Sequence, residues 1–284
     1  MPEQEPRVLV YYPETTSELI QLYRRKPSAR ICAGGTLLFS SGPSDGLGDI
    51  ISLQNIEELN RVSRTDRYIE LGAATTLTQI ADIGTPYIPQ ALLSAIDSVG
   101  PLWVRNLATI GGNVCTPAPV LTLVPMLQLL EARLELRQQG HSRWLPIGRF
   151  HPLEGGTALK ESEVLTRIRL PIATWNVQAF RKFGRETDPK PESLTFCGVA
   201  RTAKGVLQDF RFVFSTGGSL IVRNRELEAE IIGRKLPLAT RDFEALFGGM
   251  DDLFAEASLA GVQLYRARNL LRWFVRAIAE SASA

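Results

Sequence analysis

The sequence predicts an α+β fold with a separate C-terminal domain, and three observations lead to this prediction. The chain opens with a β-α-β pattern whose second strand runs into a pair of glycines. Near the other end, sheet-like residues 179–215 are followed by helix-like residues 226–278, which is an α+β order. With 284 residues, 44% of them hydrophobic and 22% charged, the chain can bury one large core or two moderate ones.

The first half of the chain alternates short strands with a few helices. A helix is predicted over residues 16–25, because Leu19, Ile20 and Leu22 recur at helical spacing. A second helix over about 89–99 ends at Gly100-Pro101. Residues 121–130 are predicted to form a buried helix, and residues 104–114 a loop. Strands are predicted at 8–12, 30–33, 49–53, 68–71, 133–137 and 163–170.

Residues 171–176 are predicted to join two domains, since a strand pattern stops at Pro171. Beyond this junction, strands are predicted at 179–182, 194–202 and 207–215, and helices at 226–232, 241–247 and 261–278. The last of these helices has its apolar residues spaced as a core-facing side.

Charge and hydropathy exclude several function classes. The 32 basic and 30 acidic residues are interspersed, so no basic stripe predicts nucleic-acid binding. The longest apolar stretch, 120–130, is interrupted by Thr122, Pro125 and Gln128, which predicts no membrane span. The first residues lack a secretory pattern, so we expect a cytoplasmic protein.

Cysteine and histidine usage predicts neither a metal site nor an iron–sulfur cluster in this chain. Cys32, Cys115 and Cys197 are far apart in sequence and no CxxC pair exists, whereas a cluster normally takes four thiolates. His141 and His151 are the only histidines. Any redox chemistry is therefore expected to come from a bound organic cofactor.

Two glycine pairs about 75 residues apart carry the most information. The first is Ala-Gly-Gly-Thr at 33–36, and the second is Thr-Ile-Gly-Gly-Asn at 109–113. Adjacent glycines let successive backbone N–H groups converge on an anion such as a diphosphate. A tight turn is the alternative interpretation of each pair. Neither fits GxGxxG, so the residues alone indicate two anion-binding loops and no Rossmann fold.

The order of three motifs carries a family resemblance. Ala-Gly-Gly-Thr at 33–36, Leu-Gly-Ala-Ala-Thr-Thr-Leu at 71–77 and Arg-Asn-Leu-Ala-Thr-Ile-Gly-Gly-Asn at 105–113 resemble the FAD-binding medium subunits of molybdenum hydroxylases of the xanthine dehydrogenase and carbon monoxide dehydrogenase type. The likeness continues through 163–171 and 180–185 and covers nearly the whole chain.

This resemblance implies a vanillyl-alcohol-oxidase-type (PCMH-type) FAD-binding fold. Its FAD-binding domain would span 1–173, as subdomains of about 1–54 and 55–173, and its C-terminal domain 174–284. The backbone of 33–38 would hold the pyrophosphate, 109–116 would bind from the opposite side, and the basic pair Arg181-Lys182 would lie near the cofactor. No catalytic side chain is implied. The implied FAD-binding residues are Ile31, Ala33, Gly34, Gly35, Thr36, Leu37, Leu38, Leu71, Ala108, Thr109, Gly111, Gly112, Asn113, Thr116, Thr122, Leu165 and Lys182.

Some positions depart from the family pattern. Ala118 stands where the family has serine, Thr122 where it has an aspartate that accepts hydrogen bonds from the cofactor, and Leu37 where Asp, Asn or Glu is common. Loss of a charge-assisted acceptor costs about 1.5–3 kcal/mol of binding. The backbone loops do not depend on these side chains.

The implied function is that of an FAD-dependent oxidoreductase subunit. Its partners would be a molybdopterin-binding large subunit and a 2Fe-2S small subunit, from which electrons would pass through FAD to NAD or another acceptor. Two alternatives stay open at this point. One is a structural subunit that has lost its flavin, and the other is a stand-alone flavin oxidoreductase.

Overall fold

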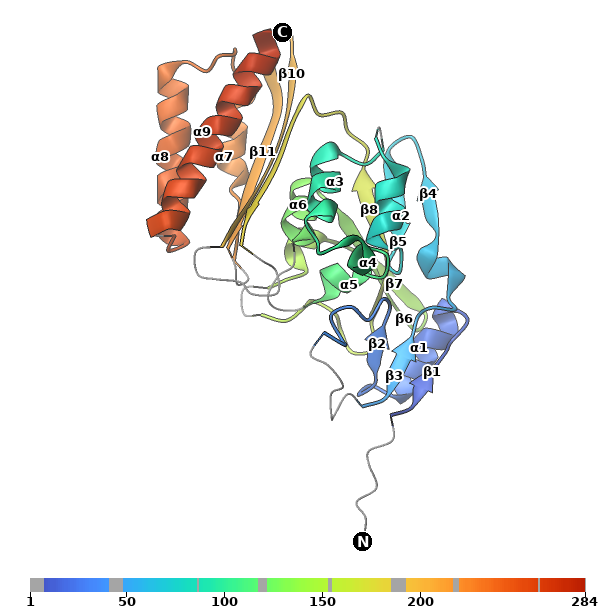
Figure 1. Cartoon of the computed structure of the whole chain (residues 1–284). Coiled ribbons are helices and arrows are strands. Elements are labelled where there is room, and N and C mark those ends of the chain that lie inside the picture. Colours follow the sequence, from blue (N-terminus) through green and yellow to red (C-terminus); the bar gives the residue numbers. More distant parts are fainter. Residues whose placement is uncertain are drawn as a thin grey trace. The chain divides into compact units, whose positions relative to one another are not determined.

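The computed structural model of the chain describes residues 8–40, 48–85, 87–116, 122–152, 155–184, 193–216, 220–259 and 261–283 (Figure 1). The chain forms two compact units, and neither is continuous in sequence. The first comprises Met1–Tyr87, Val99–Pro117 and Glu131–Ile172, and the second Ile88–Ser98, Ala118–Leu130 and Ala173–Ala284. Residues 88–98 and 118–130 thus belong to the second unit, although they precede residue 173, where the sequence predicts the end of the first domain.

The first unit begins with a three-stranded parallel sheet of order β1-β3-β2. Helix α1 buries Leu19 and Ile20 against it, in a core that includes Ile51. The predicted β-α-β start is therefore confirmed. The elements are β1 (Val10–Tyr11), α1 (Thr16–Arg25), β2 (Arg30–Cys32) and β3 (Ile50–Ser52).

A five-stranded antiparallel sheet of order β4-β5-β8-β6-β7 forms the rest of this unit. Strands β5, β6 and β8 were predicted, whereas β4 and β7 were missed. The region predicted as a loop over 104–114 contains two short helices, α4 and α5. The bounds are β4 (Val62–Arg64), β5 (Tyr68–Gly72), α2 (Leu77–Ile83), α4 (Leu102–Arg105), α5 (Ile110–Cys115), β6 (Arg133–Gln138), β7 (His141–Pro146) and β8 (Val164–Pro171), with 3-10 turns at Glu57–Asn60 and Ile147–Arg149.

The second unit is a four-stranded antiparallel sheet with helices packed against it. The strand order is β12-β11-β10-β9, so β9 is an edge strand. Helices α8 and α9 are longer than predicted. The elements are α3 (Gln90–Asp97), α6 (Leu123–Leu129), β9 (Val177–Phe183), β10 (Leu194–Ala203), β11 (Val206–Thr216), β12 (Ile221–Val222), α7 (Arg225–Ile231), α8 (Thr240–Glu256) and α9 (Gly261–Ser283).

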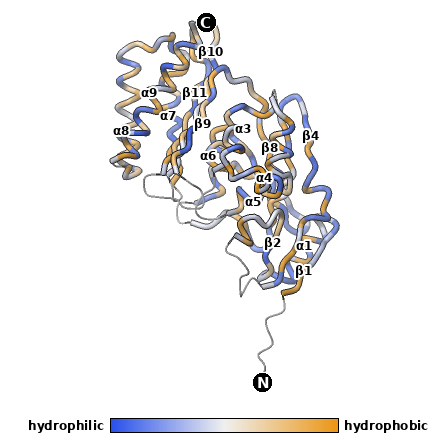
Figure 2. Tube along the Cα trace, viewed as in Figure 1, coloured by the Kyte–Doolittle hydropathy of each residue, from blue (hydrophilic) through white to orange (hydrophobic). Residues whose placement is uncertain are grey.

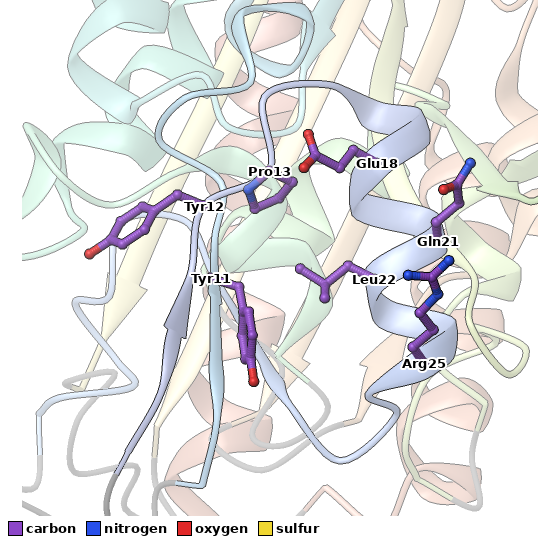
Figure 3. Close-up of a pocket in the computed structure, with 7 residues that line it drawn as sticks. All are labelled: Tyr11, Tyr12, Pro13, Glu18, Gln21, Leu22 and Arg25. Atoms are coloured by element: carbon purple, nitrogen blue, oxygen red, sulfur yellow. The ribbon is translucent and has the colours of Figure 1, made fainter.

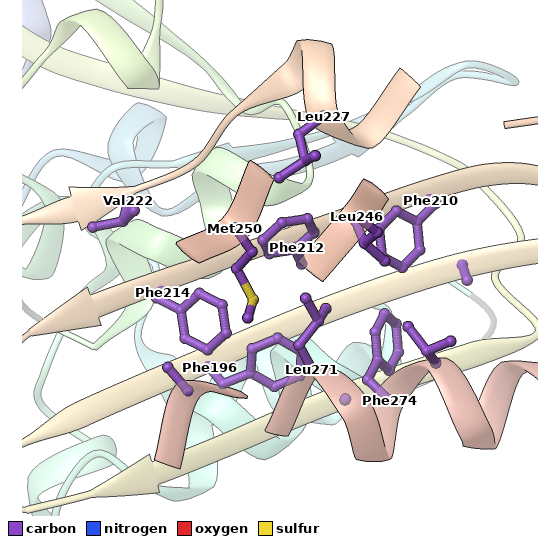
Figure 4. Close-up of a cluster of buried hydrophobic side chains, with 14 of the residues drawn as sticks. Phe196, Phe210, Phe212, Phe214, Val222, Leu227, Leu246, Met250, Leu271 and Phe274 are labelled. Atoms are coloured by element: carbon purple, nitrogen blue, oxygen red, sulfur yellow. The ribbon is translucent and has the colours of Figure 1, made fainter. Parts of the chain in front are cut away.

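One face of this sheet carries a row of phenylalanines that forms the core with α7, α8 and α9. Phe196 lies opposite Phe214 across the β10–β11 pair, with ring centroids 5.0 Å apart, and Phe274 of α9 packs on Phe196 at 5.6 Å. Figure 4 shows these rings with Leu271 and Met250 in one buried cluster. In Figure 2, hydrophobic and hydrophilic residues alternate along α9, as expected of a helix with one buried side.

Candidate functional site

The turn after β2 presents the first glycine pair. Gly35 has φ +68°, a left-handed conformation that favours glycine, and the Phe39 amide closes the turn on the Gly35 carbonyl at 3.0 Å. No group within the described ranges accepts a hydrogen bond from the amides of residues 34–38. This turn therefore leaves five successive backbone donors available to a ligand, and an anion-binding loop draws on donors of this kind.

The first glycine turn lies directly against the segment that leads into the second. A Cβ atom at Gly34 would be 1.7 Å from the Leu107 carbonyl oxygen, so only glycine allows this contact. The motifs at 33–36 and 105–113, separate in sequence, are therefore neighbours in the first unit.

The second glycine pair differs from the sequence-based expectation. Residues 110–115 form helix α5, with Thr109 as its N-cap. The Gly111 amide donates to the Ala73 carbonyl at 2.8 Å, and the Gly112 amide to the Thr109 hydroxyl at 3.0 Å. The amides of Ile110 and Asn113 also donate within the protein. The prediction of an open amide nest here is wrong, because the helix start and the neighbouring backbone use these donors.

Residues 72–76, within the motif at 71–77, contact the second glycine pair through backbone groups. The Thr75 carbonyl accepts from the Ile110 amide at 3.0 Å, and a Cβ at Gly111 would lie 2.5 Å from the Ala73 carbonyl oxygen. The Thr75 hydroxyl is buried and has no hydrogen-bond partner in the part of the chain that the structure describes. Sequence reasoning missed Thr75, since nothing in Ala-Ala-Thr-Thr indicates which threonine is buried.

The structure brings most of the predicted FAD-binding residues into the first unit, but with different exposure. Leu71 and Leu165 are buried in strands β5 and β8, whereas Leu37 is exposed. Asn113 is buried in α5, and the Thr116 hydroxyl donates to the Gly112 carbonyl at 2.9 Å. Ala118 lies outside the described residues. The remaining members of this group, Ile31, Ala33, Gly34, Gly35, Thr36, Leu38 and Ala108, lie on β2, on the first turn and before α5.

Thr122 and Lys182 belong to the second unit. The Lys182 ammonium donates to the Thr122 hydroxyl at 2.5 Å, on the side of β9 that faces α6. Arg181 lies on the other side of the strand, with its guanidinium 4.7 Å from the centre of the Trp273 ring. Successive strand residues point to opposite faces, so the predicted basic pair is divided and its two members do not share one environment.

The geometry of the first turn fits the pyrophosphate of a dinucleotide. Five amides without a hydrogen-bond partner among the described residues supply donors, and the missing side chain of Gly34 lets the turn lie against the Leu107 carbonyl. Leu37 and Phe39 expose apolar surface on the same turn, and Leu107 does so beside Gly34. A ligand with both a charged linker and apolar rings matches this combination.

The pocket in Figure 3 does not contribute to this arrangement. It encloses about 210 Å³, less than the roughly 300–1,000 Å³ common for small-molecule sites, and no predicted FAD-binding residue lines it. Its lining residues are Tyr11, Tyr12, Pro13, Glu18, Gln21, Leu22 and Arg25.

The described residues offer neither a metal-ligand cluster nor a membrane-spanning helix. They contain no group of three or more histidine, cysteine or acidic residues that could hold a metal ion. None of the helices described is both long and apolar enough to cross a bilayer. The three thiols are free; burial raises the pKa of Cys115 to about 12 and also raises that of Cys32.

Comparison with known proteins identifies the family. Residues 4–173 match the family model described as the FAD binding domain in molybdopterin dehydrogenase. The chain is 26% identical to the xanthine dehydrogenase FAD-binding subunit of Escherichia coli O157:H7 over 239 residues, covering 82% of this chain and 81% of that protein. It is 29% identical to aldehyde oxidase 2 of Cavia porcellus, covering 83% of this chain but 19% of that longer protein.

Solved structures show the same fold. A chain of reconstituted CO dehydrogenase from Oligotropha carboxidovorans superposes with a TM-score of 0.77 at 20% identity, over 99% of this chain and 100% of that one. A chain of carbon monoxide dehydrogenase from Hydrogenophaga pseudoflava gives 0.70 at 23% identity, over 86% and 85%. The predicted fold class, the predicted FAD cofactor and the oxidoreductase class are thereby confirmed. The chain belongs to the family of FAD-binding domains of molybdopterin dehydrogenases.

Proposed function

We propose that this chain is an electron-transfer subunit that holds FAD through the backbone amides of residues 34–38. The observation that carries the proposal is the turn itself, with five amide donors that no described residue uses, beside a carbonyl that tolerates only glycine at position 34. Bound FAD supplies a centre that accepts electrons singly and releases them in pairs. The chain's own residues bind and orient the cofactor, and no side chain acts as an acid, base or nucleophile.

The other assigned residues have less direct support. Thr109 fixes the start of α5 and so the position of Asn113, a buried polar side chain close in sequence to the second glycine pair. Thr122 and Lys182, which belong to the other unit, are assigned from the family resemblance alone. Arg181 is left out of the proposed site because it stacks on Trp273.

We infer that the electrons come from an iron–sulfur subunit and pass to NAD or another acceptor, in a complex with a molybdopterin-binding subunit. A relative of comparable length, from Escherichia coli O157:H7, is named a subunit of xanthine dehydrogenase, which supports a multi-chain enzyme. The free thiols are consistent with a reducing compartment, so we place the complex in the cytoplasm.

A flavin-free structural subunit is the second candidate, and one observation favours it. The hydroxyl of Thr122, which replaces the family's aspartate, already accepts a hydrogen bond from Lys182. Titration of the purified chain with FAD, followed by quenching of flavin fluorescence, separates the two candidates. Saturable quenching and a yellow protein support the proposal, whereas absence of quenching at all FAD concentrations supports the structural subunit.

A stand-alone flavin oxidoreductase is tested with the same FAD-loaded chain. Rapid reduction of its flavin by small organic substrates, with no partner chain present, would favour that alternative. We expect no such reduction, and we expect reduction when an iron–sulfur partner is supplied in its reduced form.

A further inference from the structure

The outward side of helix α9 carries large side chains that the core of the second unit does not need. Its inward side buries Leu271 and Phe274, which Figure 4 shows within the aromatic cluster. On the outward side, Tyr265 is 70% exposed, and Val262 and Trp273 are also exposed. Single exposed apolar residues are common on proteins, but a tyrosine, a tryptophan and a valine along one side of one helix form a stripe.

Arginines accompany these side chains. Arg272 and Arg276 lie on the exposed surface of α9, and Arg181 reaches the stripe from the edge strand β9, where its guanidinium stacks on Trp273. We call this set of residues the α9 outer face. It consists of Arg181, Val262, Tyr265, Arg272, Trp273 and Arg276.

The charges of this face are not balanced within the described structure. Residues 261–283 contain four arginines and one glutamate, a net charge of +3 (4 − 1). Arg268 pairs with Asp251 of α8 at 2.7 Å. Arg181, Arg272 and Arg276 form no ion pair with any carboxylate that the structure describes; Arg272 instead packs over the Phe247 ring at 5.4 Å.

We propose that the α9 outer face docks an acidic surface of a protein partner. Tyrosine, tryptophan and arginine are the residues that most often dominate the binding energy of protein interfaces. From Val262 to Arg276 the stripe is about 21 Å long at 1.5 Å per residue, which suits part of an interface of ordinary size. The three arginines without carboxylate partners in the described structure give this face a positive charge, which an acidic partner surface would complement.

A nucleic acid fits this face less well than an acidic protein. The whole chain carries a net charge of only +2, and phosphate-backbone binding draws on more cations than three arginines. The inference rests on the proposed function in one respect, which is that the chain works in a complex with other chains.

The test uses the complex isolated from its native cell through an affinity tag on the full chain. A photo-cross-linking amino acid replaces Tyr265, and in a matched control it replaces Glu226, which is exposed on α7. We expect the probe at 265 to join a different protein chain, at a peptide rich in Asp and Glu, and the probe at 226 not to do so. Cross-links only to lipid, to nucleic acid or to a second copy of this chain would overturn the proposal.

A pair of charge reversals gives a second measurement. Arg272→Glu with Arg276→Glu changes the net charge of α9 from +3 to −1 (2 − 3), and Arg201→Glu with Lys204→Glu makes the same change of four charges at the β10–β11 turn. At about 0.15 M salt we expect the first pair to lower the co-purified partner about tenfold or more, and the second pair to leave it unchanged. Equal losses in both pairs, or none in either, contradict the proposal.

The α9 variants are also checked for folding and cofactor. Tyr265→Ala removes only an exposed side chain and should leave the fold intact. If the charge reversal lowers the melting temperature, loss of the partner from the Tyr265→Ala variant tests the α9 outer face instead. FAD content and molybdenum and iron content are measured in parallel. A wild-type chain with neither FAD nor metal-bearing partners argues against the proposed function, whereas a complete complex that Tyr265→Ala and the reversals leave intact argues against the α9 outer face alone.

Discussion

Gly34→Ala is the sharpest test of the cofactor loop. The new Cβ would lie 1.7 Å from the Leu107 carbonyl oxygen and 2.5 Å from its carbon, whereas ordinary contact begins near 3.4 Å. The two backbones must therefore separate by about 1.7 Å, because neither atom belongs to a flexible side chain. Overpacking of this kind costs about 1–3 kcal/mol of folding free energy.

The same separation moves the amides that we assign to the pyrophosphate. If one charge-assisted hydrogen bond is lost, at about 1.5–3 kcal/mol, FAD affinity falls about 10- to 150-fold. Fluorescence titration with FAD measures this loss, and thermal unfolding measures the folding cost separately. We expect a smaller effect from Gly112→Ala, whose Cβ would meet only the Thr109 hydroxyl at 3.0 Å.

Gly248→Ala is the matched control for this series. Gly248 lies in α8, a Cβ there would meet nothing within 4 Å, and alanine favours a helix over glycine by about 0.5–1 kcal/mol. We expect unchanged FAD affinity and equal or higher stability. If Gly34→Ala instead bound FAD as tightly as the wild type and melted at the same temperature, the contact with Leu107 and the assignment of this turn would both be refuted.

Three further predictions concern the rest of the first unit. Thr109→Ala removes the N-cap of α5 and should lower the unfolding free energy by about 0.5–2 kcal/mol, with Thr109→Ser close to wild type; equal melting temperatures for both variants would contradict this. The Arg143 guanidinium, 2.7 Å from the buried Glu163 carboxylate, lowers the pKa of Glu163 below its ordinary 4.5. A lowered folded-state pKa stabilises the fold above the unfolded pKa and loses that effect as the pH falls, so Glu163→Gln should cost about 1–3 kcal/mol at neutral pH, and the difference from wild type should shrink below pH 4.5. A pH-independent difference in urea unfolding would count against the ion pair. Finally, iodoacetamide should modify the half-buried Cys32 before Cys115, whose pKa burial raises to about 12; mass spectrometry of the native chain showing the opposite order would exclude this picture.

The sequence predicts an element correctly where the hydrophobic periodicity of that element alone identifies it. The helix at 16–25, the strand before Gly34 and the C-terminal sheet with its helices all follow from local periodicity. Helices α4 and α5 were missed because four and six residues hold less than two helical turns, too few to show a period. Strand β7 was missed for a similar reason, since its residues, including Arg143 and Trp144, do not alternate between apolar and polar.

Long-range pairing was beyond the sequence. Nothing local shows that α3 and α6 join the C-terminal sheet, where the Gln178 side chain accepts from the Ala91 amide at 3.1 Å and the Leu129 carbonyl accepts from Arg211 at 3.4 Å. The division of the basic pair Arg181-Lys182 was within reach, however. Both residues were placed on a strand, and strand geometry alone puts neighbours on opposite faces.

The two Gly-Gly pairs have the same sequence but different roles, because their tertiary contacts differ. At 34–35 glycine brings the turn against the Leu107 carbonyl, and the amides of this turn have no partner among the residues that the structure describes. At 111 glycine lets the start of α5 lie against the Ala73 carbonyl, and the Gly111 amide donates its hydrogen bond to that carbonyl. A backbone amide has one hydrogen to donate, so an amide that already donates within the protein is a poor donor to a phosphate. We therefore propose that anion binding in this unit depends on the first turn, and that the second pair holds the neighbouring backbone in position.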